Sequence, residues 1–282
     1  MKIYIRIWLL LTVLLGIEYW ALNYQQNLSI LLMLQKLNWI SPKIKFNTTP
    51  GRTISLWAGW IGFGLMVLMN VYSLRKRFEF MHKLGKLSNW LNFHIFCGLL
   101  GPTLIFFHSG LKVRGLVGIS FWSMVVSLSS GIIGKYFFTQ LSAQRSDFDK
   151  ISTAALTSLN ESFQRRKIEV DENLKTKVLN ANLLFSGASL TTKTIDPLTA
   201  FLSSFAGDFR LRFFDMPIPK DWPLSAKSYI SRYSLSKRKA QFLGPFEKLM
   251  GYWHAFHFPF AVFMYVAAVI HIASSLIFLS SG

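Results

Sequence analysis

The sequence predicts an all-α integral membrane protein with about five transmembrane helices and a cytoplasmic, mostly helical insert. Hydrophobic residues make up 51% of the 282 residues, and the mean hydropathy is +0.34. Several apolar runs reach the length of about 20 residues that a helix needs to cross a bilayer. The formal net charge is +18, and the basic residues gather beside these runs. This placement favours contact with anionic lipid over binding of nucleic acid.

Residues 1–137 are predicted to contain four spans, with an interfacial segment at 25–52. The first span, 1–24, has the basic start of a signal peptide, but no A-x-A cleavage site follows, so we expect it to be retained. The apolar piece within 25–52 is too short to span, which favours a helix lying in the interface. Glu18 is either a functional residue within the first span or a residue at the lipid–water boundary. The remaining three spans are predicted at 53–74, 89–111 and 115–137.

The loop after the second span gives the topology. It carries five basic residues against one acid, Glu79. The positive-inside rule places this loop, and with it the N-terminus, in the cytoplasm. We therefore expect a multi-pass protein of the bacterial inner (cytoplasmic) membrane with an extracytoplasmic C-terminus. The basic residues are Arg75, Lys76, Arg77, Lys83 and Lys86.

Residues 138–250 differ in composition from the rest of the chain. They hold 17 basic and 11 acidic residues and no apolar run of 20 residues. Amphipathic helical patterns occur at 146–166, 197–214 and 225–250, which predicts a cytoplasmic helical insert resting on the inner face of the membrane. The insert lacks a nucleotide-binding glycine motif. The fifth span, within 251–282, follows it.

Two of the predicted spans each carry two histidines at the same spacing. His94 and His108 lie on the third span, and His257 and His271 lie on the fifth. Fourteen residues of helix return to within about 40° of the starting direction and rise about 21 Å. The two spans run in the same direction because one inward span separates them. The sequence therefore predicts that His94 meets His257 near the cytoplasmic face and that His108 meets His271 near the outer face.

Two facing imidazoles are the axial ligand set of a bis-histidine haem. Gly98 and Gly101 share the direction of the first histidine pair, and Ala261 and Ala268 share that of the second. These small residues leave room for a ring, although tight helix packing would require them equally. The lone Cys97 excludes covalent C-x-x-C-H attachment and Cys-ligated iron–sulfur clusters within this chain, which favours b-type haem. Histidines about 21 Å apart on one helix do not share a zinc ion, and chlorophyll needs only one axial ligand.

Three further residues are candidates for cofactor binding. His254 lies one turn before His257, where it would serve a quinone, bond a haem propionate or replace a ligand; the alternative is an ordinary interfacial histidine. Lys112 and Arg114 lie just beyond His108, where they would pair with propionates. A plain basic turn explains these two residues equally well.

The histidine-bearing stretches NFHIFCGLLGPTLIFFHSG and YWHAFHFPFAVFMYVAAVIHI resemble the b-type cytochromes. They are similar to the four-helix haem core of cytochrome b and the ferric reductases, and closest to a bacterial group of dihaem membrane cytochromes. The resemblance covers roughly 75–140 and 235–275 and implies that all four histidines ligate haem. The chain lacks the Pro-Glu-Trp-Tyr motif of the cytochrome b quinol site, and it lacks the flavin and NAD(P) domains of the ferric reductases.

We therefore expect a dihaem b-type cytochrome that carries electrons across the membrane. It would be a subunit of a respiratory or photosynthetic redox complex that links quinone to a redox partner. One alternative is a ferric-reductase-like subunit that receives electrons from a separate flavoprotein. The alternative of another class is a non-redox membrane anchor or assembly protein, in which the histidines only pack.

Overall fold

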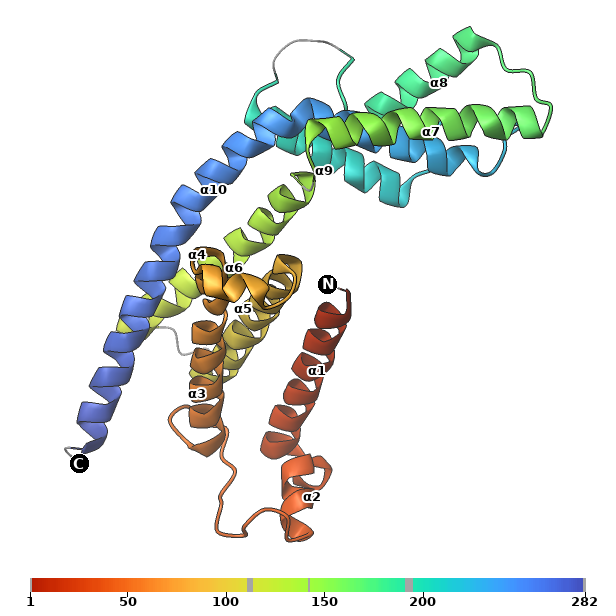
Figure 1. The fold of residues 1–282 in the computed structure, drawn as a ribbon. Helices are drawn as coiled ribbons and strands as arrows, with labels where there is room; N and C mark the ends of the chain where they lie inside the picture. The colour runs from red at the N-terminus through yellow and green to blue at the C-terminus, as the bar shows by residue number, and fades with distance from the viewer. Residues whose placement is uncertain (1, 111–113, 142, 191–194, 281–282) are drawn as a thin grey trace. The chain divides into compact units, whose positions relative to one another are not determined.

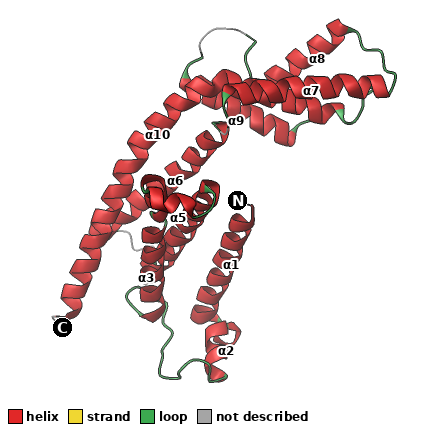
Figure 2. Cartoon of the chain, in the orientation of Figure 1, coloured by secondary structure: helices red, strands yellow, loops and turns green. Residues whose placement is uncertain are grey.

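The computed structural model describes residues 2–110, 114–141, 143–190 and 195–280, and the regular elements of these residues are all helices (Figures 1 and 2). The predicted all-helical class is confirmed. In chain order the helices are α1 (Lys2–Tyr24), the 3-10 helix η1 (Gln26–Leu28), α2 (Ile30–Lys36), α3 (Thr53–Leu68), α4 (Val71–Arg77), the 3-10 helix η2 (Glu79–Lys83), α5 (Leu87–Ser109), α6 (Gly115–Gln140), α7 (Arg145–Arg165), α8 (Glu172–Phe185), α9 (Pro197–Phe213) and α10 (Ala226–Ser280).

Five helical segments within the described residues are long and apolar enough to cross a membrane. Many of their large apolar side chains are exposed, among them Leu10, Ile61 and Phe263. A span that contacts acyl chains exposes apolar side chains. Polar groups at the same positions would find no water to bond in the bilayer core. The five segments are Lys2–Tyr24, Thr53–Arg77, Leu87–Ser109, Val117–Gln140 and Ala226–Ile277.

The chain divides into two compact units. The first contains residues 1–131 and 258–282, and the second contains residues 132–257. Helix α10 contributes to both units as one uninterrupted helix of 55 residues. The sequence predicts an insert helix at 225–250 and a separate span at 251–279, but no helix end lies between them. Gly251 lies at that point, with Gly244 and Pro245 up to two turns before it, and the helix continues through all three. An interior glycine costs about 1 kcal/mol and an interior proline about 3 kcal/mol relative to alanine.

In the first unit, α1 and the short helix α2 are held together by Glu18. Its carboxylate accepts hydrogen bonds from Oγ of Ser29 at 2.5 Å, the amide of Ile30 at 2.8 Å and the amide of Leu31 at 3.1 Å. A carboxylate at a helix N-terminus satisfies amides that have no partner within the helix. These contacts give Glu18 a structural role, which the sequence did not predict, and they leave open whether it is also functional or lies at the lipid–water boundary.

In the second unit, caps and two apolar clusters define the helices. The N-caps of α8 and α9 are Asp171 and Asp196, and each carboxylate accepts a backbone amide of the first turn. One cluster contains Phe163 and Trp222, whose ring centroids lie 4.9 Å apart. The second cluster joins the C-terminal end of α6 to α9 and α10 through four buried residues, Phe137, Ala200, Phe242 and Phe246.

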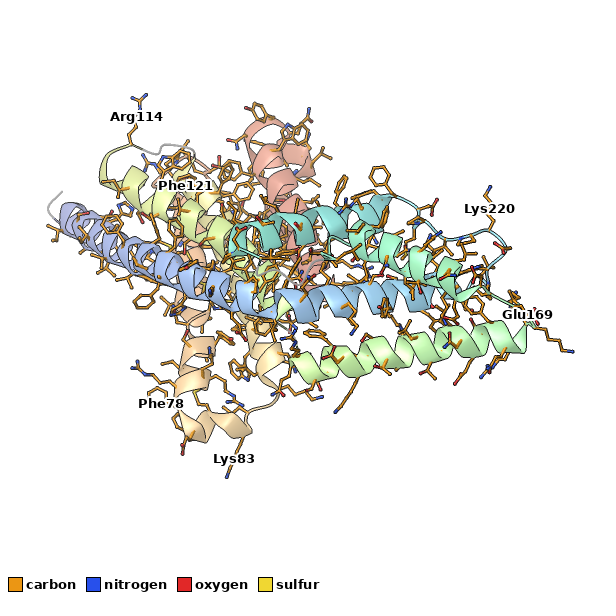
Figure 3. All side chains as sticks on the ribbon, turned by 90° about the horizontal axis from the view of Figure 1, so that it is seen from above. Phe78, Lys83, Arg114, Phe121, Glu169 and Lys220 are labelled. Carbon is orange, nitrogen blue, oxygen red and sulfur yellow. The ribbon has the colours of Figure 1, made fainter. Side chains whose placement is uncertain are left out.

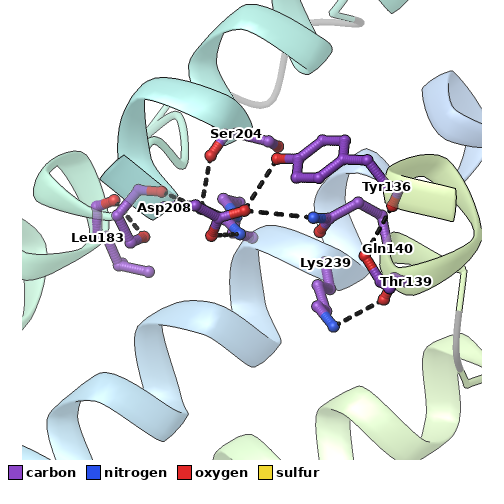
Figure 4. Close-up of polar contacts among 9 residues, drawn as sticks. Tyr136, Thr139, Gln140, Leu183, Ser204, Asp208 and Lys239 are labelled. Carbon is purple, nitrogen blue, oxygen red and sulfur yellow. Dashed lines mark hydrogen bonds and ion pairs between the residues drawn. The ribbon is translucent and has the colours of Figure 1, made fainter. Parts of the chain in front are cut away.

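An ion pair with a buried arginine connects four helices of the second unit. The guanidinium of Arg238, which is 1% exposed, donates to a carboxylate oxygen of Asp208 at 2.5 Å. It also donates to the carbonyl oxygens of Ser186 and Ser204. The other carboxylate oxygen of Asp208 accepts the hydroxyl of Tyr136 at 2.9 Å, so that α6, α9 and α10 meet at this pair beside the end of α8 (Figure 4).

Candidate functional site

Helix α3 packs along α5, the helix that carries His94 and His108, in antiparallel direction. The closest approach is at Gly62 and Gly101. A Cβ atom at Gly101 would lie 3.1 Å from the carbonyl oxygen of Gly62 and 2.8 Å from Cγ of Met66. Gly101 is the midpoint of the interval between the two histidines. The contact between Gly62 and Gly101 therefore keeps α3 close to α5 both toward His94 and toward His108. The backbone of α3 is then within reach of both imidazoles.

His108 is held by the first turn of α3 through two reciprocal hydrogen bonds. Its Nδ1 lies 2.8 Å from the carbonyl oxygen of Ser55, and Oγ of Ser55 donates to the carbonyl oxygen of His108 at 2.8 Å. Gly59 makes room for the ring, since a Cβ atom there would lie 2.6 Å from Nδ1. A carbonyl oxygen only accepts, so Nδ1 carries the proton. The neutral imidazole then keeps the lone pair on Nε2, the atom that a metal would take.

His94 is held in the same way by the other end of α3. Its Nδ1 lies 2.9 Å from the carbonyl oxygen of Met69. That carbonyl is accessible because the regular ladder of the helix is interrupted there. The amide of Ser73, its partner in an unbroken helix, bonds to Asn70 instead, and only the amide of Tyr72 approaches the Met69 carbonyl, at 3.4 Å. His94 thus has the same tautomer as His108, with Nε2 available.

Asn70 and Tyr265 stabilise this interruption of α3. The side-chain amide of Asn70 donates to the carbonyl oxygens of Met66 at 3.1 Å and Val67 at 3.3 Å, and to the hydroxyl of Tyr265 at 2.8 Å. The Tyr265 hydroxyl donates in turn to the Met66 carbonyl. These bonds satisfy a carbonyl that the break would otherwise leave unpaired in an apolar segment, which would be costly.

His108 and His271 face each other in the first unit. Their ring centroids lie 6.5 Å apart, and the ring planes form an angle of 62°. Two imidazoles that ligate one ion from opposite sides, each through a bond of about 2 Å, place their ring centres about 6 Å apart. His271 is half-buried and lies two turns beyond the buried Met264 on the same side of α10. The predicted outer pair is therefore brought together at a separation that suits a shared axial metal.

His257 is positioned within the second unit by Trp253. The two rings are stacked, with centroids 4.8 Å apart and an angle of 21° between the planes. The indole of Trp253 lies against α6 at Gly134, where a Cβ atom would come within 2.2 Å of it. The predicted partner of His257, His94, belongs to the first unit, and this pairing stays a prediction from the sequence.

The four small residues of the predicted site have different surroundings. Gly101 faces α3, so its contacts support helix packing as its role. A Cβ atom at Gly98 would lie 3.6 Å from the sulfur of Met69, an ordinary contact. Ala261 and Ala268 are partly exposed on the side of α10 that carries His271.

Of the remaining candidates, Arg114 lies just before α6 and His254 lies in the middle of α10. Arg114 is exposed just before α6 and extends away from it (Figure 3). Lys112 lies outside the described residues. His254 is exposed on α10, next to Trp253. Arg114 therefore remains either a partner of haem propionates or a residue of a plain basic turn. His254 remains either a cofactor-binding residue or an ordinary interfacial histidine.

The supporting residues on α3 and at its C-cap are not predicted by the sequence. Ser55 and Met69 act through their carbonyl oxygens, which every residue has, so no side-chain pattern reveals them. A signal did exist in the closely spaced glycines 59 and 62 of the second span, which mark close helix approach.

The candidate metal ligands at the outer site are the two histidines His108 and His271. Within the described part of the chain, no group of three or more His, Cys, Asp or Glu side chains converges. A haem iron takes only two axial protein ligands, and the facing pair His108 and His271 fits that requirement. Comparison of the chain with protein-family models, curated proteins and solved structures gives no match.

Proposed function

We propose that the chain is a membrane cytochrome in which His108 and His271 ligate one b-type haem. One observation carries the proposal: the two rings face each other at 6.5 Å while the Ser55 carbonyl holds the proton of His108 on Nδ1. Metal-ligating histidines commonly donate the second ring nitrogen to a carbonyl, because this fixes the tautomer and raises the basicity of the ligating atom. A histidine that only packs does not need a facing histidine at this distance.

The proposal extends to a second b-type haem at His94. The Met69 carbonyl bonds its Nδ1 as Ser55 bonds that of His108. The expected second ligand, His257, follows from the equal spacing in the sequence alone. Bound haem supplies reversible one-electron transfer at its iron. The carbonyl oxygens of Met69 and Ser55 hold the imidazoles of His94 and His108 in one tautomer and one orientation.

Two haems at the levels of His94 and His108 would carry electrons across the membrane. We propose that the chain serves in this way as a subunit of a respiratory or photosynthetic complex of the bacterial inner membrane, linking quinone to a redox partner. The N-terminus would be cytoplasmic and the C-terminus extracytoplasmic, as the basic loop after the second span predicts. Lys112 and Arg114 would pair with the propionates of the outer haem.

The test is the haem content of the full chain purified from membranes. We expect a b-type α band in the reduced-minus-oxidised spectrum and two haems per chain by pyridine haemochrome. His108→Ala and His271→Ala should each reduce the content to one, while His82→Ala, in the basic loop, should leave two. Added imidazole should restore the lost haem to a His271→Gly variant, which separates loss of a ligand from misfolding.

Two results would contradict the proposal. Purified protein without a b-type band would favour the non-redox anchor or assembly protein. Unchanged haem content in both His108→Ala and His271→Ala would show that the facing pair does not ligate. Electron transfer from a separate flavoprotein, without oxidation of quinol, would instead identify a ferric-reductase-like subunit with the same haem site.

A further inference from the structure

Helix α9 of the second unit carries an uninterrupted stripe of apolar side chains that are largely exposed among the described residues. Its five side chains follow one another at intervals of three or four residues, so they lie on one side of the helix. Each is more than half exposed, from 52% at Phe209 to 67% at Phe213. The stripe consists of Leu198, Leu202, Phe205, Phe209 and Phe213. Such a length of exposed apolar surface marks an interaction site.

The opposite side of α9 is fixed in the core of the second unit. Ala200 and Ser204 are fully buried, and a Cβ atom at Gly207 would lie 1.8 Å from the carbonyl oxygen of Ser186. Asp208, between the two sides, is tied to the buried Arg238. The helix therefore cannot rotate its stripe inward without breaking these contacts.

The stripe adjoins the end of a candidate membrane span. The ring of Phe205 lies 6.2 Å from that of Tyr136, and Tyr136 belongs to the span Val117–Gln140. The same end of the span exposes Ile132 and Ile133. Apolar surface that would face lipid on α6 thus continues onto α9 within one unit.

Positive charge accompanies the stripe. Arg212 is exposed and lies one residue before Phe213, and Arg210 packs over the ring of Phe185 while donating to the carbonyl oxygen of Leu184. The one acidic side chain inside α9, Asp208, is paired with Arg238. An apolar stripe bordered by arginines is typical of helices that lie in the interface of a membrane with anionic lipid.

We propose that α9 is an in-plane membrane helix that binds anionic phospholipid. Its stripe enters the boundary between headgroups and acyl chains, and the exposed Arg212 contacts lipid phosphates. The helix of 17 residues is about 25 Å long. It would fix the second unit on the membrane surface whether or not the histidines hold haem.

The test is electron paramagnetic resonance of the full chain in lipid vesicles. A nitroxide is attached at Phe209→Cys in a Cys97→Ala background, and at Thr157→Cys on an exposed position of α7 as the control. In phosphatidylcholine vesicles containing phosphatidylglycerol, the label at 209 should collide with oxygen and be protected from a water-soluble nickel chelate. The label at 157 should show the reverse. Replacing Arg212 with glutamate (Arg212→Glu) should shift the 209 label toward water, whereas Arg166→Glu at the C-cap of α7 should not.

Each contrary result has a distinct meaning. Collision of the 209 label with the nickel chelate would place α9 in water and overturn the proposal. Protection from both reagents would show that protein covers the stripe, a second copy or another subunit, and would also overturn it. An Arg212→Glu variant with unchanged depth would remove the role of lipid phosphate. Haem content is measured on the same samples, so failure here and failure of the haem proposal are distinguished.

Discussion

His108 and Ser55 bond each other in both directions, the imidazole to the Ser55 carbonyl and the Ser55 hydroxyl to the His108 carbonyl. The same helix supplies the Met69 carbonyl to His94. Ser55 and Met69 are fourteen residues apart, as are the two histidines, and α3 runs antiparallel to α5. The backbone of one helix thus orients both imidazoles. Substitutions in α3 should therefore affect haem binding at His94 and His108 even where the histidines themselves are unchanged.

Gly59→Ala should disturb the outer site. The new Cβ atom would lie 2.6 Å from Nδ1 of His108, so the ring must move away from the Ser55 carbonyl. Overpacking of this kind costs about 1–3 kcal/mol. We expect haem content to fall from two toward one per chain, with a lower unfolding temperature. Gly64→Ala is the matched control, because nothing lies within 4 Å of a Cβ atom there. Equal haem content in the two variants would show that His108 does not need this position.

Asn70→Ala should weaken the inner site. Without the side-chain amide, α3 can continue as a regular helix, and the amide of Ser73 then competes with His94 for the Met69 carbonyl. Loss of a partner that orients a ligating histidine typically lowers metal affinity about 10–100-fold. We expect faster haem loss on dilution and a higher reduction potential for one haem, because its imidazole becomes a weaker donor. Asn160→Ala on α7 is the control, and identical redox titrations of the two variants would count against the role of Asn70.

The sequence was sufficient to predict the helical class and the alignment of His108 with His271, because both depend on helical periodicity and span length. Fourteen residues return to nearly the same side of any helix. The supporting bonds could not be predicted, since backbone carbonyls carry no sequence signature. The break at Asn70 is a local departure from a helix that the apolar run alone predicts as continuous.

At helix α10 the sequence predicts a break that the structure does not have. Composition changes sharply near residue 250, which suggested two elements, but a change in polarity along a chain does not end a helix. Even Gly244 and Pro245, which disfavour a helix, lie inside α10 just before Gly251, and the helix continues through them. The pair of Arg238 and Asp208 was missed for a related reason: in sequence both look like solvated charges, and only the fold brings them together.

Helix α9 should loosen at its N-terminus in acid. Asp196 caps the helix, and the hydrogen bond from the Thr199 side chain, followed by that from its amide, lowers the pKa of this carboxyl. A lowered pKa in the folded state means that stabilisation is complete above the unfolded pKa of about 4 and is lost as the pH falls through the folded pKa. Hydrogen exchange of the first-turn amides, corrected for intrinsic rates, should rise below about pH 4. Asp196→Asn should remove this pH dependence, and an unchanged profile in that variant would assign it elsewhere.

Asp208→Ala should destabilise the second unit far more than removal of an exposed pair. It leaves the guanidinium of Arg238 buried with only two carbonyl partners and removes the acceptor of the Tyr136 hydroxyl. Removing the partner of a buried charge costs about 3 kcal/mol in a fully buried pair, and the 35% exposure of the Asp208 side chain makes the cost smaller here. Asp215→Ala is the matched control: its pair with Lys227 is 2.9 Å long but solvent-exposed, and such pairs contribute little. Thermal unfolding and limited proteolysis of 132–257 should separate the two variants. Equal effects would show that the Arg238 network does not hold α6, α9 and α10 together.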